Sequence, residues 1–355
     1  MQTVALVTLG DPHQLTGGYL YHQRLADRAA RHDARLTFVS LPQRPFPLPA
    51  IAAGQAMQQV KSAGADVAVI DSIAAAFLGP SLAMRHPGVP LVGMLHQPPG
   101  GIDAGGLRRA IQTLLDRWTY RYTPILLVAS EALAASLVAA GIPRHRLRVV
   151  PPGRDVAPRP DGPLPDLRQG RRIALLAVGN WVERKGIHSL VEAFSRLPAD
   201  TATLHLVGND NADPRYARRI HERLQRADLA GRVVIHGPLP TTEVARLYAA
   251  ADVFVLPSTR EPYGTVYGEA MAAGLPVVGW AAGNLPFLAA HEREGLIVPT
   301  GDVAALAAAL QRLADDPSLR RRLGEAGRQR AAGRPTWDET AALFFTAVRE
   351  ASHGT

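Results

Sequence analysis

Short apolar runs alternate with amphipathic stretches along most of this 355-residue chain. The runs are rich in valine, leucine and isoleucine, which is typical of strands buried on both faces of a parallel sheet. The predicted strands are 3–9, 36–41, 66–70, 90–95, 125–128 and 147–150, followed by 173–178, 203–207, 233–236, 253–256, 276–279 and 296–298. Because helical patterns separate these strands, we predict an α/β protein built from doubly wound, Rossmann-like sheets.

The alternation is interrupted in the proline-rich stretch from 151 to 170, which has no apolar periodicity. Such a stretch favours an extended linker, and a chain of this length divides naturally into two domains. We therefore expect an N-terminal domain over residues 1–160 and a C-terminal domain over 161–335. A final helix within 336–355 is expected to pack back on the first domain. A ligand site is expected between the two domains.

The composition is that of a globular protein, with 47% hydrophobic and 20% charged residues. The chain contains no cysteine, which excludes disulfides, a thiolate nucleophile and cysteine-bound zinc. Its apolar runs are shorter than a membrane span, and its first run lacks the basic flank and cleavage site of a signal peptide. These features lead us to expect a cytoplasmic protein.

The net charge is +8, and the basic residues are nearly all arginine, since Lys61 and Lys185 are the two lysines. Arginine-rich coding bias is one explanation, and attraction to anions is the other. Nucleotide diphosphates or an anionic membrane face are favoured partners, whereas the lack of basic runs interleaved with aromatic residues argues against nucleic acid. Peripheral membrane contact is left open, because a predicted helix over 107–122 carries four arginines that do not share one face, namely Arg108, Arg109, Arg117 and Arg121.

Two glycine-bearing turns after predicted strands carry candidate chemistry. Gly17 and Gly18 follow the first strand, and adjacent glycines let backbone N–H groups approach an anion. The second turn starts at Gly179 and presents Arg184 and Lys185 just before a helix. A lysine in a chain that otherwise uses arginine indicates a compact ammonium for phosphate contact, with a solvated charged loop as the alternative. A nicotinamide or flavin dinucleotide is disfavoured, because no G-x-G-x-x-G fingerprint follows a predicted strand. A Walker A pattern is absent from the sequence as well.

The third turn lies within the stretch VFVLPSTREPYGTVYGEAMAAG, residues 253–274. An apolar strand ends at Pro257, and a helix begins near Gly264, so free N–H groups at the helix start can meet phosphate. Glu261 precedes this helix and Glu269 lies within it, with seven residues between them. Carboxylates accept hydrogen bonds from vicinal sugar hydroxyls, although exposed surface acids would give the same pattern.

The E-x7-E spacing in STREPYGTVYGEAMAAGLPVV resembles the signature of retaining glycosyltransferases of family 4. Further similar stretches are the Gly17-Gly18 loop, His96 after its strand, SEALAASL ahead of VVPPGRD, the loop 178–186 and AAADVFVLPS, so the resemblance covers nearly the whole chain. It implies the GT-B fold, in which two Rossmann-like domains face each other across an interdomain cleft. It also implies transfer of a hexose-type sugar from a nucleotide-diphosphate sugar to a hydroxyl acceptor.

The resemblance implies a role for each matching residue. Glu269 would hold the ribose of the donor, Glu261 would lie near the ring hydroxyls of the transferred sugar, and Lys185 would neutralise the diphosphate leaving group. His96 would lie beside the sugar near the reacting carbon. His96, Lys185 and Glu261 therefore form the expected catalytic set. The remaining expected donor-binding residues are Gly17, Gly18, Gly179, Arg184, Tyr263, Gly264 and Thr265.

Two positions depart from the family pattern. Asn180 stands where an arginine is common, so Arg184 is the candidate replacement, and Phe287 replaces a glutamate, so that position receives no role. The chain also has no Asp-x-Asp triplet, so we expect neither a metal ion nor another cofactor. Lys185 and the helix dipole would then stabilise the charge that develops on the leaving phosphate.

Three other activities remain open from the sequence. A glycoside hydrolase or phosphorylase would use Glu261 and Glu269 as acid and nucleophile. A sugar-nucleotide epimerase, or a binder of nucleotide sugars without catalysis, would use the same donor site. The hydroxyl acceptor is unidentified and is expected on the first domain, near residues 17–22, 42–49 and 96–106.

Overall fold

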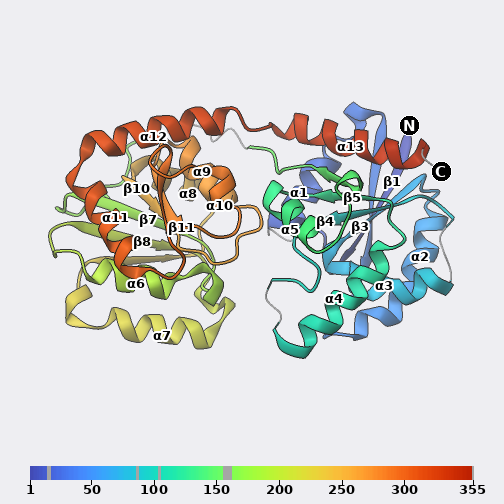
Figure 1. Cartoon of the computed structure of the whole chain (residues 1–355), viewed down its shortest axis with the longest axis horizontal. Helices are drawn as coiled ribbons and strands as arrows, with labels where there is room; N and C mark the ends of the chain where they lie inside the picture. The colour runs from blue at the N-terminus through green and yellow to red at the C-terminus, as the bar shows by residue number, and fades with distance from the viewer. Residues whose placement is uncertain (14–16, 85–87, 103–104, 155–161, 354–355) are drawn as a thin grey trace. The chain divides into compact units, whose positions relative to one another are not determined.

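The structure is a computed structural model that describes residues 1–13, 17–84, 88–102, 105–154 and 162–353. The chain divides into two compact units, Met1–Gly153 with Pro335–Thr355 (unit 1) and Arg154–Arg334 (unit 2). Each unit contains a six-stranded sheet, and all of the strand pairs in both sheets are parallel (Figure 1). Much of the predicted linker, residues 155–161, lies outside the described residues. None of the helices among these residues combines the length and the apolar character that crossing a bilayer requires.

Unit 1 alternates strands and helices from its first residue, as the apolar pattern predicts. Its elements are β1 (Gln2–Leu9), α1 (Gly17–Ala26), β2 (Ala34–Leu41), α2 (Ala53–Ser62), β3 (Val67–Asp71), α3 (Ser72–Met84), β4 (Leu91–Leu95), α4 (Gly106–Tyr120), β5 (Ile125–Val128), α5 (Glu131–Ala139), β6 (Leu147–Val149) and α13 (Trp337–His353). The strand order is β2-β1-β3-β4-β5-β6. From β1 the chain continues to β2 on one side, and from β3 it continues to β4 on the other side. The place between β1 and β3 where this direction reverses is the switch point of the sheet, and ligands of such folds bind at the carboxyl ends of the strands there.

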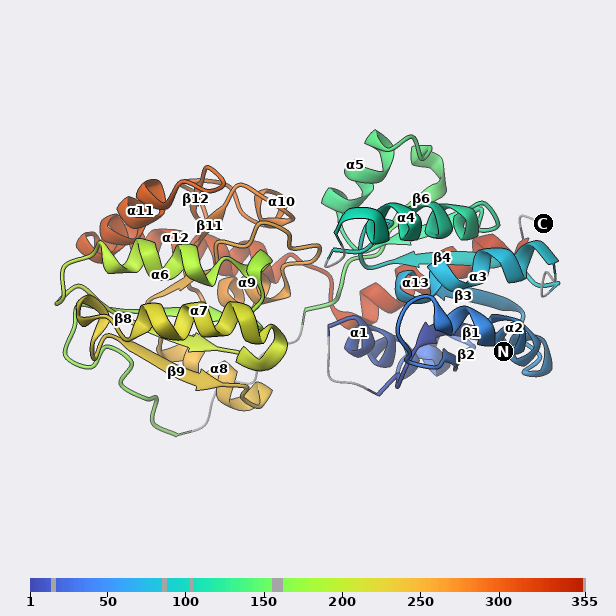
Figure 2. The same ribbon diagram turned by 90° about the horizontal axis from the view of Figure 1, so that it is seen from below.

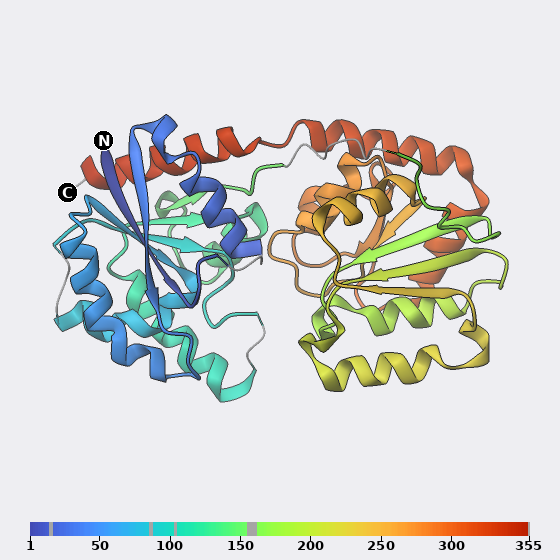
Figure 3. The same ribbon diagram turned by 180° about the vertical axis from the view of Figure 1, so that it is seen from behind.

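Helices cover both faces of the unit 1 sheet. Side chains of α2, α3 and α5 form a core with one face, and those of α1 and α13 form a core with the other. Trp337, Phe344 and Phe345 of α13 are buried in this second core together with Val4 and Leu6 of β1. Figures 1 and 3 show α13, in red, beside the sheet of unit 1.

Unit 2 repeats the alternation. Its elements are β7 (Ile173–Val178), α6 (Ile187–Ser195), β8 (Ala202–Val207), α7 (Pro214–Leu224), β9 (Val233–Gly237), α8 (Thr241–Ala250), β10 (Val253–Val255), α9 (Thr265–Ala272), β11 (Val277–Trp280), α10 (Leu285–Leu288), β12 (Gly295–Val298), α11 (Val303–Asp315) and α12 (Pro317–Ala332). The strand order is β12-β11-β10-β7-β8-β9. Its switch point lies between β7 and β10, where Leu175 pairs with Val253.

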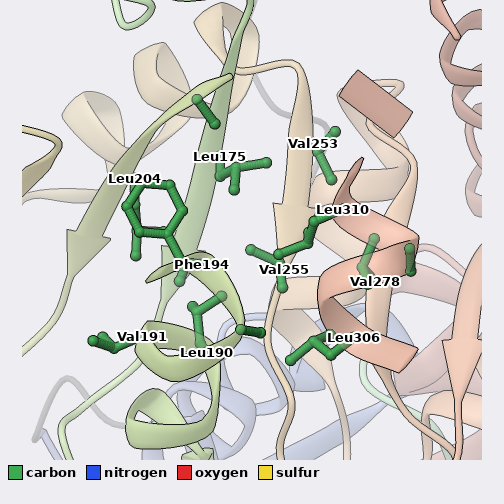
Figure 4. Packing of buried hydrophobic residues seen from close by; sticks show 14 of the residues in the cluster. Leu175, Leu190, Val191, Phe194, Leu204, Val253, Val255, Val278, Leu306 and Leu310 are labelled. Carbon is green, nitrogen blue, oxygen red and sulfur yellow. The ribbon is translucent and has the colours of Figure 1, made fainter. Parts of the chain in front are cut away.

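The largest core of unit 2 lies under α6, α7 and α11, which cover the same sheet face. Leu190 and Phe194 of α6, with Leu306 and Leu310 of α11, pack against strand residues such as Val255 (Figure 4). Figure 2 shows α6 and α7 side by side along this face. Helices α8 and α9 cover the opposite face through a second core. Because helices cover both faces of the sheet, side chains that point to either face are buried, and the strands are therefore almost continuously apolar.

The predicted fold class of two doubly wound parallel units is confirmed. The ends of the predicted strands differ from the observed ends by at most two residues, and the short helix α10 was not predicted. Helix α1 stops at Ala26, and a 3-10 turn over Ala29–His32 follows it. Asp33 then adopts a left-handed conformation with φ of 51°, which turns the chain into β2. The predicted strand 253–256 ends one residue earlier, at Val255, although the Leu256 N–H still donates a hydrogen bond of 3.0 Å to the carbonyl of Val278 in β11.

Candidate functional site

The switch point of unit 2 brings together two turns that are far apart in the sequence. Lys185 follows β7, Glu261 follows β10, and the ammonium of Lys185 forms an ion pair with the carboxylate of Glu261. Both residues are buried, with exposed fractions of 8% and 9%. Arg184 adds a second cation, with Nη1 4.0 Å from Oε2 of Glu261. Removing charges from water is costly, so these buried charges are stable only because they are paired with one another. A buried cluster of paired charges is therefore a candidate functional site.

The backbone fixes both turns around this ion pair. Ser258 Oγ and Thr259 N–H donate hydrogen bonds to the carbonyl of Arg184 at 2.9 and 2.8 Å. Gly179 adjoins the lysine, because a β-carbon there would lie in ordinary van der Waals contact with Lys185, 3.4 Å from its Cε. The structure therefore brings Gly179, Arg184, Lys185 and Glu261 into one group.

The turn after Glu261 leads into α9 through a glycine in the left-handed region. Gly264 has φ of 70° and is the N-cap of α9, and a β-carbon there would lie 2.6 Å from Leu288 Cδ1. Asn284 holds this turn in place, since its Nδ2 donates to the carbonyl of Tyr263 at 2.8 Å. Thr265 is the first residue of α9, so free N–H groups at this helix end are available to an anion.

Glu269 lies in the second turn of α9, and its carboxylate is exposed. Tyr248 of α8 donates a hydrogen bond to Oε2 of Glu269 at 3.1 Å. Burial, followed by the nearby charge of Glu269, raises the pKa of Tyr248 well above its usual value, so the hydroxyl stays protonated and remains a donor. Tyr248 is a functional candidate that the sequence analysis missed, because an aromatic residue in an amphipathic helix looks like an ordinary core residue.

Unit 1 contains a second polar cluster at its own switch point. His22 of α1, Asp71 at the end of β3 and His96 just after β4 are all buried. The Nε2 atoms of His22 and His96 are 2.7 Å apart, and Asp71 oxygens lie 3.6 Å from the first and 4.0 Å from the second. Thr8 of β1 donates a hydrogen bond of 3.0 Å to Asp71 Oδ2. Four elements therefore contribute to one network.

Both imidazoles of this network are neutral at ordinary pH. Burial lowers the pKa of His22 to about 3. Burial also lowers the pKa of His96 to about 4, an effect that Asp71 opposes and His22 assists. The pKa of Asp71 is raised, again mainly by burial. A neutral histidine pair can donate and accept hydrogen bonds, which suits hydroxyl groups better than a full negative charge.

His22, Asp71 and His96 also form a candidate metal-binding group, because their ligand atoms lie within 4.8 Å of one another. Two nitrogens on one tetrahedral zinc ion would lie about 3.3 Å apart, given bonds of about 2.0–2.1 Å. The observed 2.7 Å is instead a hydrogen-bond distance. The arrangement therefore fits a hydrogen-bonded histidine pair.

The predicted site residues form two groups, one in each unit. Gly17 and Gly18 begin α1, and a β-carbon at Gly18 would lie 3.8 Å from Cδ2 of His96, so Gly18 and His96 are neighbours. The loop ahead of Gly17 includes residues 14–16, which lie outside the described residues. Asp71 received no predicted role, although an acid that directly ends a buried apolar strand could have been recognised as a sheet-edge residue.

Two family models match the chain. The model described as Glycosyltransferase Family 4 matches residues 3–158, and the model described as Glycosyl transferases group 1 matches residues 166–330. Together these matches span the strands and both polar clusters described above.

The chain is similar to several curated proteins. It is 32% identical over 246 residues to a D-inositol 3-phosphate glycosyltransferase from Xylanimonas cellulosilytica, a match that covers 64% of this chain and 58% of that protein. It is 30% identical over 289 residues to an MMP alpha-(1->4)-mannosyltransferase from Mycolicibacterium hassiacum, with 76% and 67% covered. The chain thus spans only about three-fifths of the first of these relatives.

Among solved structures, a sucrose-phosphate synthase from Thermosynechococcus elongatus is similar over its whole length. The TM-score is 0.82 at 24% identity, and the match covers 100% of both chains. At this identity the likeness establishes the fold, and it extends through both units.

Proposed function

Because this chain belongs to glycosyltransferase family 4 and has the two-domain GT-B fold of glycosyltransferases, we propose that it is a retaining hexosyltransferase. The donor would be a nucleotide-diphosphate sugar, and the acceptor would be a hydroxyl group of a glycan, a glycolipid or a small molecule. The observation that carries this proposal is the buried ion pair of Lys185 and Glu261 at the switch point of unit 2.

Departure of the leaving group is the step that this pair would assist. The bond between the anomeric carbon and the phosphate oxygen breaks, and negative charge develops on the nucleotide diphosphate. Lys185, with Arg184 beside it, would stabilise that charge, assisted by the N–H groups at the start of α9. Glu261 would keep the ammonium in place and accept hydrogen bonds from the hydroxyls of the sugar.

Donor binding would depend on Glu269, whose carboxylate would accept hydrogen bonds from the two ribose hydroxyls. The hydrogen bond from Tyr248 orients this carboxylate before the donor arrives. An oriented carboxylate loses less rotamer freedom on binding, so it contributes more to affinity.

Retention of configuration would follow from attack on the face that the phosphate leaves. The new bond joins the anomeric carbon to the acceptor oxygen, and the acceptor proton passes to the departing phosphate oxygen. No strong enzymic base is then required. The neutral His96 fits a contact that positions a sugar hydroxyl, because its low pKa makes it a weak base. We expect neither a metal ion nor another cofactor in this reaction.

A direct test begins with thermal-shift screening of the protein against UDP, GDP and ADP and their hexose conjugates. A bound donor raises the unfolding temperature by mass action. The best donor is then incubated with hydroxyl acceptors, with and without EDTA, and the anomeric configuration of the product is determined by NMR. We expect a retained configuration and activity that survives EDTA.

Other outcomes would contradict the proposal in distinct ways. Sugar 1-phosphate or hydrolysis of simple glycosides would indicate a phosphorylase or a hydrolase, and an altered donor without acceptor would indicate an epimerase. Donor binding without any product would indicate a binding protein, and absence of any thermal shift would argue against the donor site itself.

A further inference from the structure

Helix α4 of unit 1 has its polar and apolar faces reversed relative to an ordinary surface helix. Its buried residues are Asp116, Thr119 and Tyr120. Leu107 and Leu114 are 77% and 68% exposed, and Ile111 and Trp118 are exposed as well. Exposed apolar residues are common one at a time, but a helix that exposes four large apolar residues, leaves Leu115 half-buried and buries a carboxylate requires an explanation.

The four exposed apolar residues form one continuous stripe. Leu107, Ile111, Leu114 and Trp118 follow one another at intervals of four, three and four positions. At about 100° per residue they lie within an arc of about 60°, on the side of the helix opposite Asp116. We call these four residues the α4 stripe.

The orientation of α4 is fixed by hydrogen bonds on its inner side. Asp116 Oδ2 accepts a hydrogen bond of 2.7 Å from the Gly100 N–H, and Thr119 Oγ1 donates one of 2.6 Å to the carbonyl of Ala75 in α3. Rotating the helix to bury the stripe would break both bonds and expose Tyr120. The stripe therefore faces outward in the folded unit.

Positive charge borders the α4 stripe on both sides. Arg108 lies on one flank, and Arg117 and Arg121 lie on the other, and all three are exposed. The only acidic residue of α4 is the buried Asp116. On its flank of the stripe, the guanidinium of Arg108 lies 5.7 Å from the ring centroid of Phe46.

We propose that the α4 stripe is a docking surface for a bilayer that contains anionic lipids. Leucine, isoleucine and tryptophan on one face with arginine on its borders is the composition of helices that lie in a membrane interface. The apolar side chains would enter the headgroup region, and the arginines would meet lipid phosphates. A second copy of the chain is a poorer occupant, since a symmetric contact would place arginines against arginines.

This inference does not rest on the proposed transferase activity, because it concerns a surface and a lipid rather than the donor site. If both hold, the docked protein would be held at the surface where hydroxyl-bearing lipids are exposed. The two ideas can fail separately, since vesicle binding needs no nucleotide sugar and donor binding needs no lipid.

Trp118 provides an internal probe of docking. The chain has four tryptophans, and the other three, Trp181, Trp280 and Trp337, are at most 8% exposed. Insertion of Trp118 into an interface should therefore shift the fluorescence of the whole protein to the blue. The protein is titrated with vesicles of phosphatidylcholine containing about 30% phosphatidylglycerol, and with phosphatidylcholine alone, at low and high salt. We expect a blue shift and co-sedimentation with the anionic vesicles, both weakened by salt.

Paired substitutions identify the surface. The double variant Leu107→Ser/Leu114→Ser should lose vesicle binding about tenfold or more, since two exposed apolar anchors are removed. The control is Leu343→Ser, which changes a leucine of α13 that is also exposed in unit 1. Because both sites are on the surface, far-ultraviolet circular dichroism should show unchanged folding for both variants.

Three results would overturn the proposal. One is equal vesicle binding by the double variant and the wild type, and another is no wild-type binding to anionic vesicles. The third is a blue shift of Trp118 that depends on protein concentration without lipid, together with a dimer in sedimentation velocity, which would assign the stripe to a second copy of the chain.

Discussion

The two units place polar clusters at equivalent points of their sheets, but the chemistry of the clusters differs. In unit 2 the switch point holds the charged pair of Lys185 and Glu261, with Arg184 beside it. In unit 1 it holds His22, Asp71 and His96, whose imidazoles are kept neutral by burial. The same topology therefore positions side chains without dictating their charge. The difference suits unit 2 to a phosphate-bearing ligand and unit 1 to hydroxyl groups.

The largest effect should come from removing the cation of unit 2. Lys185→Ala is expected to lower kcat about 100- to 1000-fold, because the developing charge on the leaving phosphate loses its main partner. Steady-state kinetics with the identified donor would measure this loss. Lys61→Ala is the matched control, since Lys61 is the only other lysine and is exposed. If kcat of the Lys185→Ala variant stayed close to that of the wild type, the charged cluster of unit 2 would not be the one that stabilises the leaving phosphate.

Lowering the pH should reduce the free energy of unfolding through the neutral histidines of unit 1. His22 and His96 take up protons near pH 6.5 when unfolded, but their folded pKa values are about 3 and 4. The unfolded state thus binds more protons below pH 6.5, and stability should fall by about 1 kcal/mol per pH unit per histidine until the folded pKa is approached. Asp71 has the opposite effect on stability. Because its pKa is raised in the folded state, the folded protein binds this proton at a higher pH than the unfolded protein does, which stabilises the fold as the pH falls.

Urea unfolding between pH 7.5 and 4.5 would measure this slope. His22→Gln, which removes one titrating ring but keeps hydrogen-bonding groups, should flatten it relative to the wild type. His145→Gln changes an exposed histidine of the same unit and should leave the slope nearly unchanged. Identical slopes in wild type and His22→Gln would contradict the picture of a neutral buried pair.

A smaller effect is expected at the turn that begins α9. Gly264→Ala should lower the free energy of unfolding by about 2 kcal/mol, from the left-handed backbone and the close approach of Leu288. Gly301→Ala is a useful control, because Gly301 has φ of 85° but no neighbour within 4 Å of an added β-carbon. Its loss should be about 1 kcal/mol. Equal losses in calorimetry would show that the contact with Leu288 adds nothing.

The smallest effect should follow from Tyr248→Phe. Without the hydrogen bond to Glu269, the donor KM is expected to rise about three- to tenfold with little change in kcat. Tyr216→Phe is the control, since Tyr216 is also a buried tyrosine of unit 2 but bonds to His188. A fall in kcat at constant KM would instead place Tyr248 in the chemical step.

Much of the fold could be predicted, because parallel strands that are buried on both faces consist of consecutive apolar residues. The predicted strands 125–128 and 173–178 match β5 and β7 at both ends. The ends of α1 could not be predicted, because the stop at Ala26 depends on a local turn that ends at Asp33 rather than on apolar periodicity.

The site could be predicted less fully than the fold. Glycines and acids after strands identified the turns, but the pairing of Lys185 with Glu261 joins residues 76 positions apart and depends on β7 lying beside β10. The network of His22 and Asp71 around His96 likewise depends on strand order. The α4 stripe was missed for another reason: apolar residues at helical spacing normally face a core, and only the exposed fractions show that these do not.

The final helix has a consequence for the order in which the protein is made. Unit 1 is discontinuous, since α13 completes a core begun by β1 and α1 more than 300 residues earlier. Unit 2 is continuous and can close its cores as soon as Arg334 has left the ribosome. Unit 2 can therefore finish folding first. In unit 1, the sheet face that α1 covers in part stays partly exposed until α13 has been synthesised.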